Sequence, residues 1–208
     1  MDNQTRKCKY CSELIQTESD LFVNWKGGYY HSDCFIKRQT SLKKGAWTYE
    51  RAKDELGRLE RETLQKINLK KQKDKLIDFL STHYEISYFP KYFYVKLESI
   101  YNGTFNGLTQ PVPPSDLFEM WQTKIDYLNR VYSKNCNAGK KIEGIQRVNY
   151  DLAILLSRYD KFLDWKEQQR FQNQIMLKEK QQEPSYIISE FHTAGEKENS
   201  IEDILDEI

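Results

Sequence analysis

Cys8-Lys-Tyr-Cys11, followed after nineteen residues by His31-Ser-Asp-Cys34, governs how the N-terminal part of this chain folds. Three thiols and one imidazole at this spacing can form a closed tetrahedral shell, which is the arrangement of structural zinc and leaves no open position for catalysis. A module of about forty residues has too small a core to fold unaided. Structural zinc contributes about 10–16 kcal/mol of apparent binding free energy. We therefore expect one structural zinc ion bound by Cys8, Cys11, His31 and Cys34.

The residues between the two pairs favour a β-hairpin. Residues 21–25 (Leu-Phe-Val-Asn-Trp) predict a strand, Gly27-Gly28 a turn, and residues 29–31 the returning strand. A short helix from Cys34 to about residue 39 then brings the second pair of ligands to the first. A thioredoxin-like redox pair is the alternative, but it needs a βαβ context that is absent and leaves His31 and Cys34 unexplained.

The module resembles the first half of a LIM domain and, more broadly, treble-clef zinc fingers. The resemblance rests on Cys8-x2-Cys11-x19-His31-x2-Cys34, with Tyr30 before the histidine and Phe35 after the last cysteine. A LIM domain continues with a second ligand set, whereas Phe35-Ile-Lys-Arg follows here without a cysteine, so the module is similar to a single-site relative. The resemblance implies recognition or scaffolding. The overall layout, including residues 147–156 (Arg-Val-Asn-Tyr-Asp-Leu-Ala-Ile-Leu-Leu), also resembles small phage proteins of Gram-positive bacteria.

Beyond the finger (residues 5–45), residues 47–80 predict a highly charged helix with a thin apolar stripe. The stripe consists of Leu56, Leu59, Leu64, Ile67 and Leu76. Two interpretations remain open: a solvated connector helix, or a short coiled coil that makes the protein a homodimer.

Residues 82–182 predict a helical domain with an aromatic-rich beginning. One helix is expected to start at Pro90, with Phe93, Leu97, Ile100 and Tyr101 on one face. A second is expected after a cap at Ser115 or Asp116 and should end in a loop from Asn135. A last helix from near Ile142 should place Leu155, Tyr159 and Phe162 inward. The aromatic residues between 84 and 105 have helical periodicity, which favours core packing over the alternative of stacking unpaired bases. The predicted fold class is mainly α, with a small finger of β-hairpin and short helix.

Charge is unevenly distributed along the chain. Residues 1–182 carry 31 Lys and Arg against 23 Asp and Glu, whereas residues 183–208 carry one Lys against eight acids. We expect the acidic tail at 183–208 to be disordered when free. Its apolar residues recur at helical spacing: Ile201, Ile204, Leu205 and Ile208. They could dock as a helix into a partner's groove, or the tail could fold back on the basic body and compete with nucleic acid. A merely solubilising tail is the remaining alternative.

No apolar stretch is long enough for a membrane span, and the polar start lacks a secretory signal, so we expect a cytoplasmic protein, in the host-cell cytoplasm if it is phage-encoded. Cys136 is expected to be a fortuitous free thiol, and His83 and His192 to be surface histidines. No phosphate loop, zinc-protease helix or nucleophile elbow is present. We expect neither an enzyme nor a small-molecule substrate.

The favoured hypothesis is a zinc-stabilised regulatory or accessory protein that contacts nucleic acid or a nucleic-acid-processing machine. Its phosphate contacts would come from a basic set following the finger, for which a solvated face is the alternative: Lys37, Arg38, Lys43, Lys44, Arg51 and Lys53. The competing hypothesis is a protein–protein adaptor that uses the finger and the acidic tail as docking elements.

Overall fold

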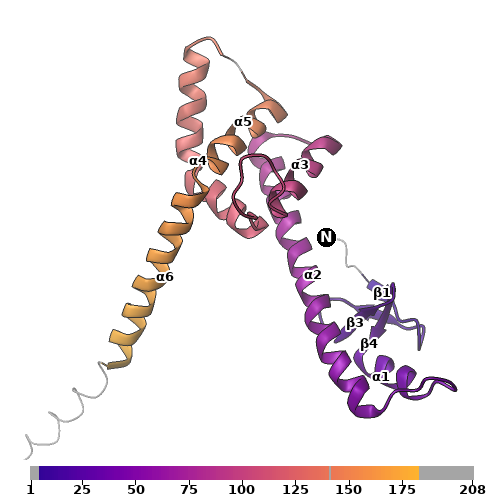
Figure 1. Cartoon of the computed structure of the whole chain (residues 1–208). Helices are drawn as coiled ribbons and strands as arrows, with labels where there is room; N and C mark the ends of the chain where they lie inside the picture. The colour runs from indigo at the N-terminus through magenta and orange to yellow at the C-terminus, as the bar shows by residue number, and fades with distance from the viewer. Residues whose placement is uncertain (1–4, 141, 183–208) are drawn as a thin grey trace, which may run out of the picture. The chain divides into compact units, whose positions relative to one another are not determined.

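The computed structural model describes residues 5–140 and 142–182 of the chain (Figure 1). The described part is mainly α, with four short strands before residue 32 and six helices from there on, which confirms the predicted fold class. The described residues fall into two units that divide after Leu152, within the fifth helix. In chain order the elements are β1 (Thr5–Lys7), β2 (Leu14–Gln16), β3 (Phe22–Trp25), β4 (Gly28–His31), α1 (Ser32–Thr40), α2 (Tyr49–Tyr84), α3 (Lys91–Tyr101), α4 (Pro114–Asn137), α5 (Gly144–Leu156) and α6 (Tyr159–Gln182).

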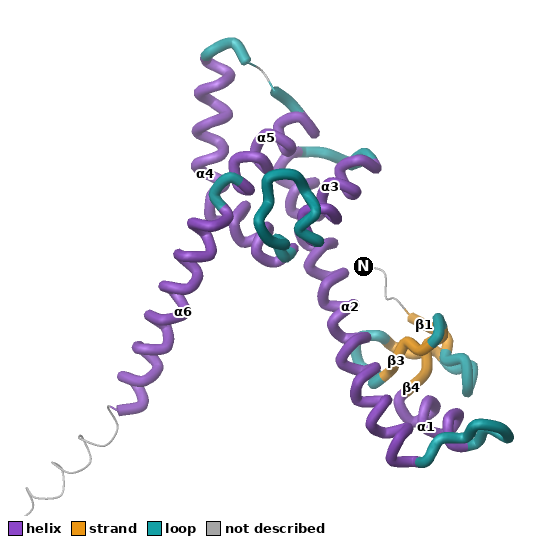
Figure 2. The backbone as a smooth tube through the Cα atoms, in the orientation of Figure 1, coloured by secondary structure: helices purple, strands orange, loops and turns teal. Residues whose placement is uncertain are grey.

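The finger contains two antiparallel hairpins and the short helix α1 (Figure 2). β1 pairs with β2 around the first two cysteines, and β3 pairs with β4 as the sequence predicts, with Phe22 opposite His31. The turn of the second hairpin is Lys26-Gly27 instead of Gly27-Gly28. Both turn residues have positive φ, 47° and 71°, as a two-residue hairpin loop of the primed type requires. Gly28 is already the first residue of β4.

Helix α2 completes the finger core with its N-terminal half. Leu56 and Leu59 are buried in the same cluster as Val23 and Phe35. The helix begins where the Thr48 side chain accepts the backbone N–H of Arg51, as an N-cap does.

Farther along α2, Leu76 and Leu80 are fully buried, whereas Leu64 and Leu69 are 56% and 42% exposed. The predicted stripe thus includes residues of the finger core and residues buried nearer the helix end. Dimerisation through residues 47–80 stays a prediction.

The helical domain is built around buried apolar residues of α2, α3 and α4. α3 begins directly after Pro90, as predicted, and buries Phe93, Leu97 and Ile100. α4 starts at Pro114, before the expected caps, because a proline at the first helical position needs no N–H partner and has the right φ. The helix also runs to Asn137, one residue past Cys136, which the sequence places in a loop.

The sequence predicts one last long helix, but the structure has two helices there. α5 ends at Leu156 and α6 begins at Tyr159. Between them the N–H of Arg158 donates to the carbonyl of Leu155 at 2.9 Å, a bond three residues back that tightens and ends the helix. Leu155, Tyr159 and Phe162 are nevertheless buried, as the periodicity predicts. None of the helices in the described residues has the length and apolar character needed to cross a membrane.

Candidate metal centre

The four predicted ligands converge at one end of the two hairpins. Cys8 follows β1, Cys11 lies in the turn before β2, His31 ends β4, and Cys34 lies in the first turn of α1. One ligand atom from each residue lies within 4.8 Å of the others. Elements that are distant in sequence thus place three sulfurs and one imidazole around a common point.

Backbone hydrogen bonds shape the turn that carries the two cysteines. The Cys8 N–H donates to the carbonyl of Glu13 at 2.8 Å, and the Ser12 N–H donates back to Cys8 at 3.0 Å. Ser12 has a φ of 64°, which closes the turn. The Lys9 N–H donates to the carbonyl of Tyr29 at 2.9 Å, which ties the turn to β4 two residues before His31.

The orientation of His31 identifies its ligand nitrogen. Nδ1 lies 3.4 Å from the Cys11 sulfur, so this nitrogen faces the cluster. Nε2 lies on the other side, 4.0 Å from Oδ2 of Asp20. The same carboxylate oxygen accepts the backbone N–H of Gln16 at 2.7 Å, which holds it in place. A carboxylate behind a ligating imidazole fixes the ring and its tautomer, a common partner of metal-bound histidine.

The thiols of Cys8 and Cys34 differ in their pKa values. Burial acts to raise the pKa of the Cys8 thiol, but hydrogen bonds from the backbone of Cys11, Tyr10 and His31 outweigh it and lower the pKa to about 6. Burial and the two neighbouring cysteines raise the pKa of Cys34 to about 12. A single negative charge is therefore accommodated, whereas three thiolates together need a positive ion between them.

The donor set fits a metal ion with soft ligands and four-coordinate geometry. Three thiolates and one imidazole suit Zn²⁺ and would complete its shell without an open position. Such an ion would build the fold and supply no chemistry. The residues needed to hold it are the four that the spacing singles out, and Asp20 is the supporting residue that the sequence did not reveal.

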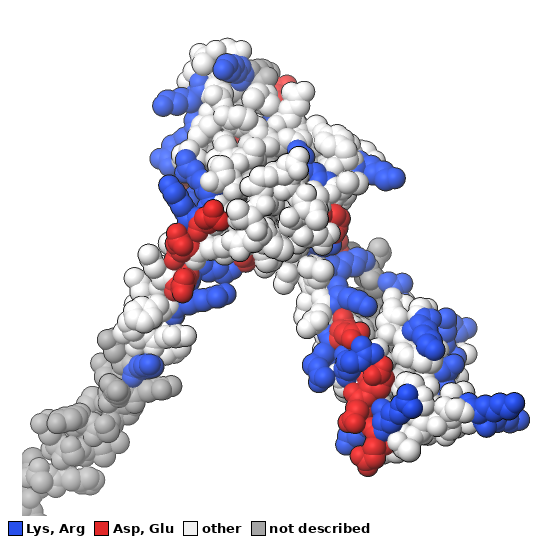
Figure 3. All heavy atoms as spheres, in the orientation of Figure 1, with Lys and Arg blue, Asp and Glu red and all other residues white. Residues whose placement is uncertain are grey.

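The predicted basic residues do not form one uniform surface. Lys37 and Lys53 are exposed on α1 and α2, and Lys43 and Lys44 are exposed in the loop between these helices. Arg38 is half-buried, with its guanidinium 5.0 Å from the ring centroid of Trp25. Figure 3 shows Lys and Arg side chains over the finger and acidic side chains in a stripe along α2.

The sequence interpretation did not single out two tryptophans, Trp25 and Trp47, that lie close together. Trp25 and Trp47 meet edge to face with centroids 6.3 Å apart. Lys26 lies 4.7 Å from the Trp25 ring and Arg51 4.8 Å from the Trp47 ring. The alternation of aromatic and basic residues at Trp25-Lys26 and near Trp47 was the available signal. We call Trp25, Lys26, Trp47 and Arg51 the tryptophan face.

The helical domain contains a buried polar cluster that the sequence did not reveal. The Tyr84 hydroxyl donates to Oδ2 of Asp151 at 2.7 Å and accepts the indole N–H of Trp121 at 2.8 Å. The Arg147 guanidinium lies 3.9 Å from the Tyr132 ring centroid. Burial raises the pKa of Asp151, and the bond from Tyr84 and the charge of Arg147 oppose this. The cluster links α2, α4 and α5 within one unit.

The other predicted candidates are dispersed. Cys136 is half-buried at the end of α4. The aromatic residues at 84–105 divide into buried ones, such as Phe89 and Phe93, and exposed ones, such as Tyr88 at 77%. His192 and the apolar tail residues Ile201, Ile204, Leu205 and Ile208 lie outside the described residues. Comparison with family models, curated proteins and solved structures gave no match.

Proposed function

We propose that this chain is a non-enzymatic, zinc-stabilised accessory or regulatory protein that contacts nucleic acid, or a machine that processes it, through its finger. The observation that carries the proposal is the tryptophan face. Lys26 and Arg51 lie against the rings of Trp25 and Trp47. Aromatic rings beside cations suit unpaired bases and phosphates together, since bases stack on rings while cations neutralise the backbone.

The ligand set supports a structural role for the metal. A closed shell of three thiolates and an imidazole leaves no coordination position for water or substrate. Its contribution is to fix β3, β4 and α1, which carry Trp25 and Arg38 and flank the turn that contains Lys26. A LIM-like, treble-clef classification of the finger, a phage origin and a cytoplasmic location belong to the same proposal.

Charge near the tryptophan face is mixed, which identifies the cations that would act. Glu55 and Glu62 both bond to Arg58, so this arginine is already neutralised. Lys43 and Lys44 lie in the adjoining loop and are exposed. We therefore assign phosphate contact to these two lysines and Arg51, and a packing role to Arg38.

The test is a binding titration of the zinc-loaded chain against single-stranded and duplex DNA and RNA over a salt series. Affinity should fall steeply with salt, because each phosphate contact adds about 0.7 to the slope of log K against log salt for single strands. Lys43→Gln with Lys44→Gln should flatten that slope. Lys124→Gln on α4 removes one exposed lysine elsewhere and is the control. Absence of binding to every nucleic acid at low salt would refute the proposal.

A further inference from the structure

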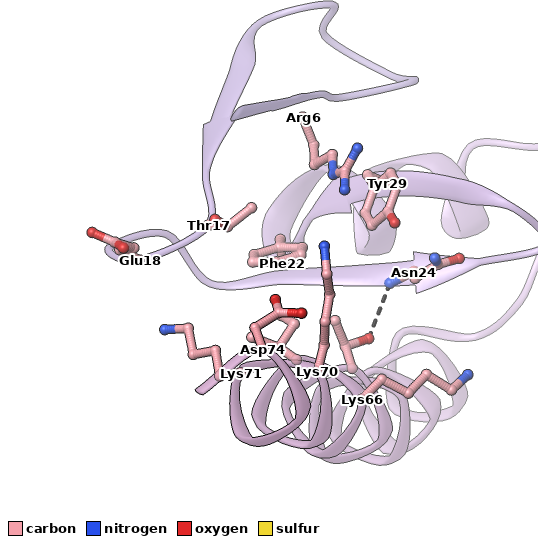
Figure 4. Close-up of a pocket in the computed structure, with 12 residues that line it drawn as sticks. Arg6, Thr17, Glu18, Phe22, Asn24, Tyr29, Lys66, Lys70, Lys71 and Asp74 are labelled. Atoms are coloured by element: carbon pink, nitrogen blue, oxygen red, sulfur yellow. Dashed lines mark hydrogen bonds between the residues drawn. The ribbon is translucent and has the colours of Figure 1, made fainter. Parts of the chain in front are cut away.

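A groove lies between the finger hairpins and the middle of α2 (Figure 4). Its volume is about 330 Å³, within the range of about 300–1,000 Å³ typical of small-ligand sites. The hairpin side supplies Arg6, Phe22 and Tyr29, and α2 supplies Ile67 and Lys70. The groove lies on another part of the finger from the tryptophan face, whose residues do not line it.

Positive charge is concentrated in this groove. Four cations line it against two acids, Glu18 and Asp74. Lys70 extends from α2 across the groove toward Arg6, and the side chains of Lys66 and Lys71 diverge to either side (Figure 4). Among the residues that the structure describes, Lys70 makes no hydrogen bond or ion pair. Two like charges directed into one hollow favour an anion between them.

The walls of the groove are aromatic and apolar. Phe22 is 7% exposed, and its ring centroid lies 6.2 Å from that of Tyr29. The Arg6 guanidinium lies 5.2 Å from the Tyr29 centroid. Unpaired bases stack on aromatic rings and on arginine guanidinium planes, and this wall of the groove offers both. Ile67 packs against the finger core beside these rings.

These features together select one kind of ligand. A phosphate alone needs no aromatic wall, and an apolar peptide needs no converging cations. A nucleotide carries both an anionic phosphate and a flat ring. A hollow of this size admits one nucleotide, whereas the bases of a duplex are stacked inside the helix and cannot enter it.

We propose that the groove binds one nucleotide unit of a single-stranded nucleic acid, with its phosphate between Arg6 and Lys70 and its base against Tyr29. The site rests on the proposed nucleic-acid function and deepens it. It divides the strand contact between a groove that holds one nucleotide and a tryptophan face that holds others.

The experiment uses the zinc-loaded full chain and a fluorescent oligothymidylate of about 12 nucleotides, a length suited to site sizes of about 4–16. Lys70→Gln should weaken binding and lower the salt slope by about 0.7. Asp74→Asn removes a repelling carboxylate from the groove and should tighten binding. Lys124→Gln is the matched control. Unchanged zinc content and thermal unfolding would show that each variant is folded.

Base placement is tested by photo-cross-linking with an oligonucleotide that carries 5-iododeoxyuridine, followed by mass spectrometry. Cross-links at Phe22 or Tyr29 support the groove. If wild-type protein binds but Lys70→Gln and Asp74→Asn leave affinity unchanged, or cross-links map only to Trp25 and Trp47, the groove is overturned and the proposed function stands. Equal competition by duplex also overturns the groove. If no nucleic acid binds, both fail.

Discussion

The backbone N–H of Asn24 in β3 donates a hydrogen bond of 3.1 Å to the side-chain oxygen of Thr63 in α2. Thr63 is 6% exposed, so the bond lies inside the junction between the finger and the helix. A second bond, from the Ser32 hydroxyl to Glu60 at 2.5 Å, joins α1 to the same helix one turn earlier. The finger is thus fastened to α2 by polar contacts as well as by Leu56 and Leu59.

Replacing Thr63 with valine should destabilise this junction. Valine keeps the volume but removes the acceptor, which leaves the Asn24 N–H without its partner at a cost of about 1–3 kcal/mol. Urea unfolding followed by tryptophan fluorescence measures the change. Thr63→Ser retains the oxygen and is the control, so equal stability of the two variants would show that the hydrogen bond contributes nothing.

The metal content is expected to be one zinc ion per chain. Elemental analysis measures it directly. Cys34→Ser should abolish zinc binding and unfold the finger, because the ion supplies the stability that its small core lacks. Cys136→Ser removes a thiol far from the cluster and should retain one zinc. A folded finger in the metal-free protein would contradict the expectation.

Asp20 should tune the affinity for the ion. Asp20→Asn weakens the contact that orients His31, and supporting residues of this kind typically change metal affinity by about 10–100-fold. Competition with a chromophoric chelator measures the affinity. Glu18→Gln removes the charge of another acidic residue in the same loop and should have a smaller effect. Equal effects would assign the change to net charge alone.

Tyr84→Phe should destabilise the helical domain. It leaves the indole N–H of Trp121 and the carboxylate of Asp151 without their hydroxyl partner, at a cost of about 1–3 kcal/mol for each buried group. Tyr101 offers a matched control, since its hydroxyl is buried and has no hydrogen-bond partner among the residues that the structure describes. Tyr101→Phe should therefore be neutral or stabilising. Thermal unfolding followed by circular dichroism compares the two variants.

His83 should make the helical domain less stable as pH falls. His83 is half-buried, so the expectation of a surface histidine was wrong. Burial lowers the pKa of His83, and the nearby charge of Arg147 lowers it further. The unfolded chain then binds the proton more readily. The resulting stability is present above the ordinary value of 6.5 and is lost as pH falls through the lower folded value.

Urea unfolding of wild type and His83→Gln between about pH 5 and 8 isolates this effect. All other residues are the same in both proteins, so their contributions cancel in the difference. The stability advantage of wild type over the variant should shrink toward low pH. A difference that does not vary with pH would contradict the assignment.

The spacing of Cys8, Cys11, His31 and Cys34 was sufficient to predict which side chains meet, because few arrangements other than a metal site use that pattern. Helical periodicity likewise predicted that Phe93, Leu97 and Ile100 are buried. Periodicity does not predict which other element packs against the apolar face of a helix. Leu56 and Leu59 were therefore not assigned to the finger core.

The sequence also did not predict which polar side chains form hydrogen bonds with one another. Asp151 is fully buried on α5, and only the fold places Tyr84 beside it, whereas Arg147 lies one turn earlier on the same helix. The end of α5 at Leu156 depends on local hydrogen bonds that no apolar pattern records. Lys70 belongs to a run of exposed lysines, and only the position of the hairpin distinguishes it from its neighbours.

Because α2 is one continuous helix, the direction in which Leu56 and Leu59 face is fixed relative to that of Leu76 and Leu80. Leu59 and Leu76 are seventeen positions apart, about 25 Å along the axis at the usual rise per residue. Each residue inserted between them would turn the two sets relative to each other by about 100°. A single inserted alanine should thus destabilise the fold. Seven inserted residues make close to two full turns and should restore the original orientation of the two sets of buried residues. The middle of α2 should therefore tolerate a change of length only in steps close to two full turns.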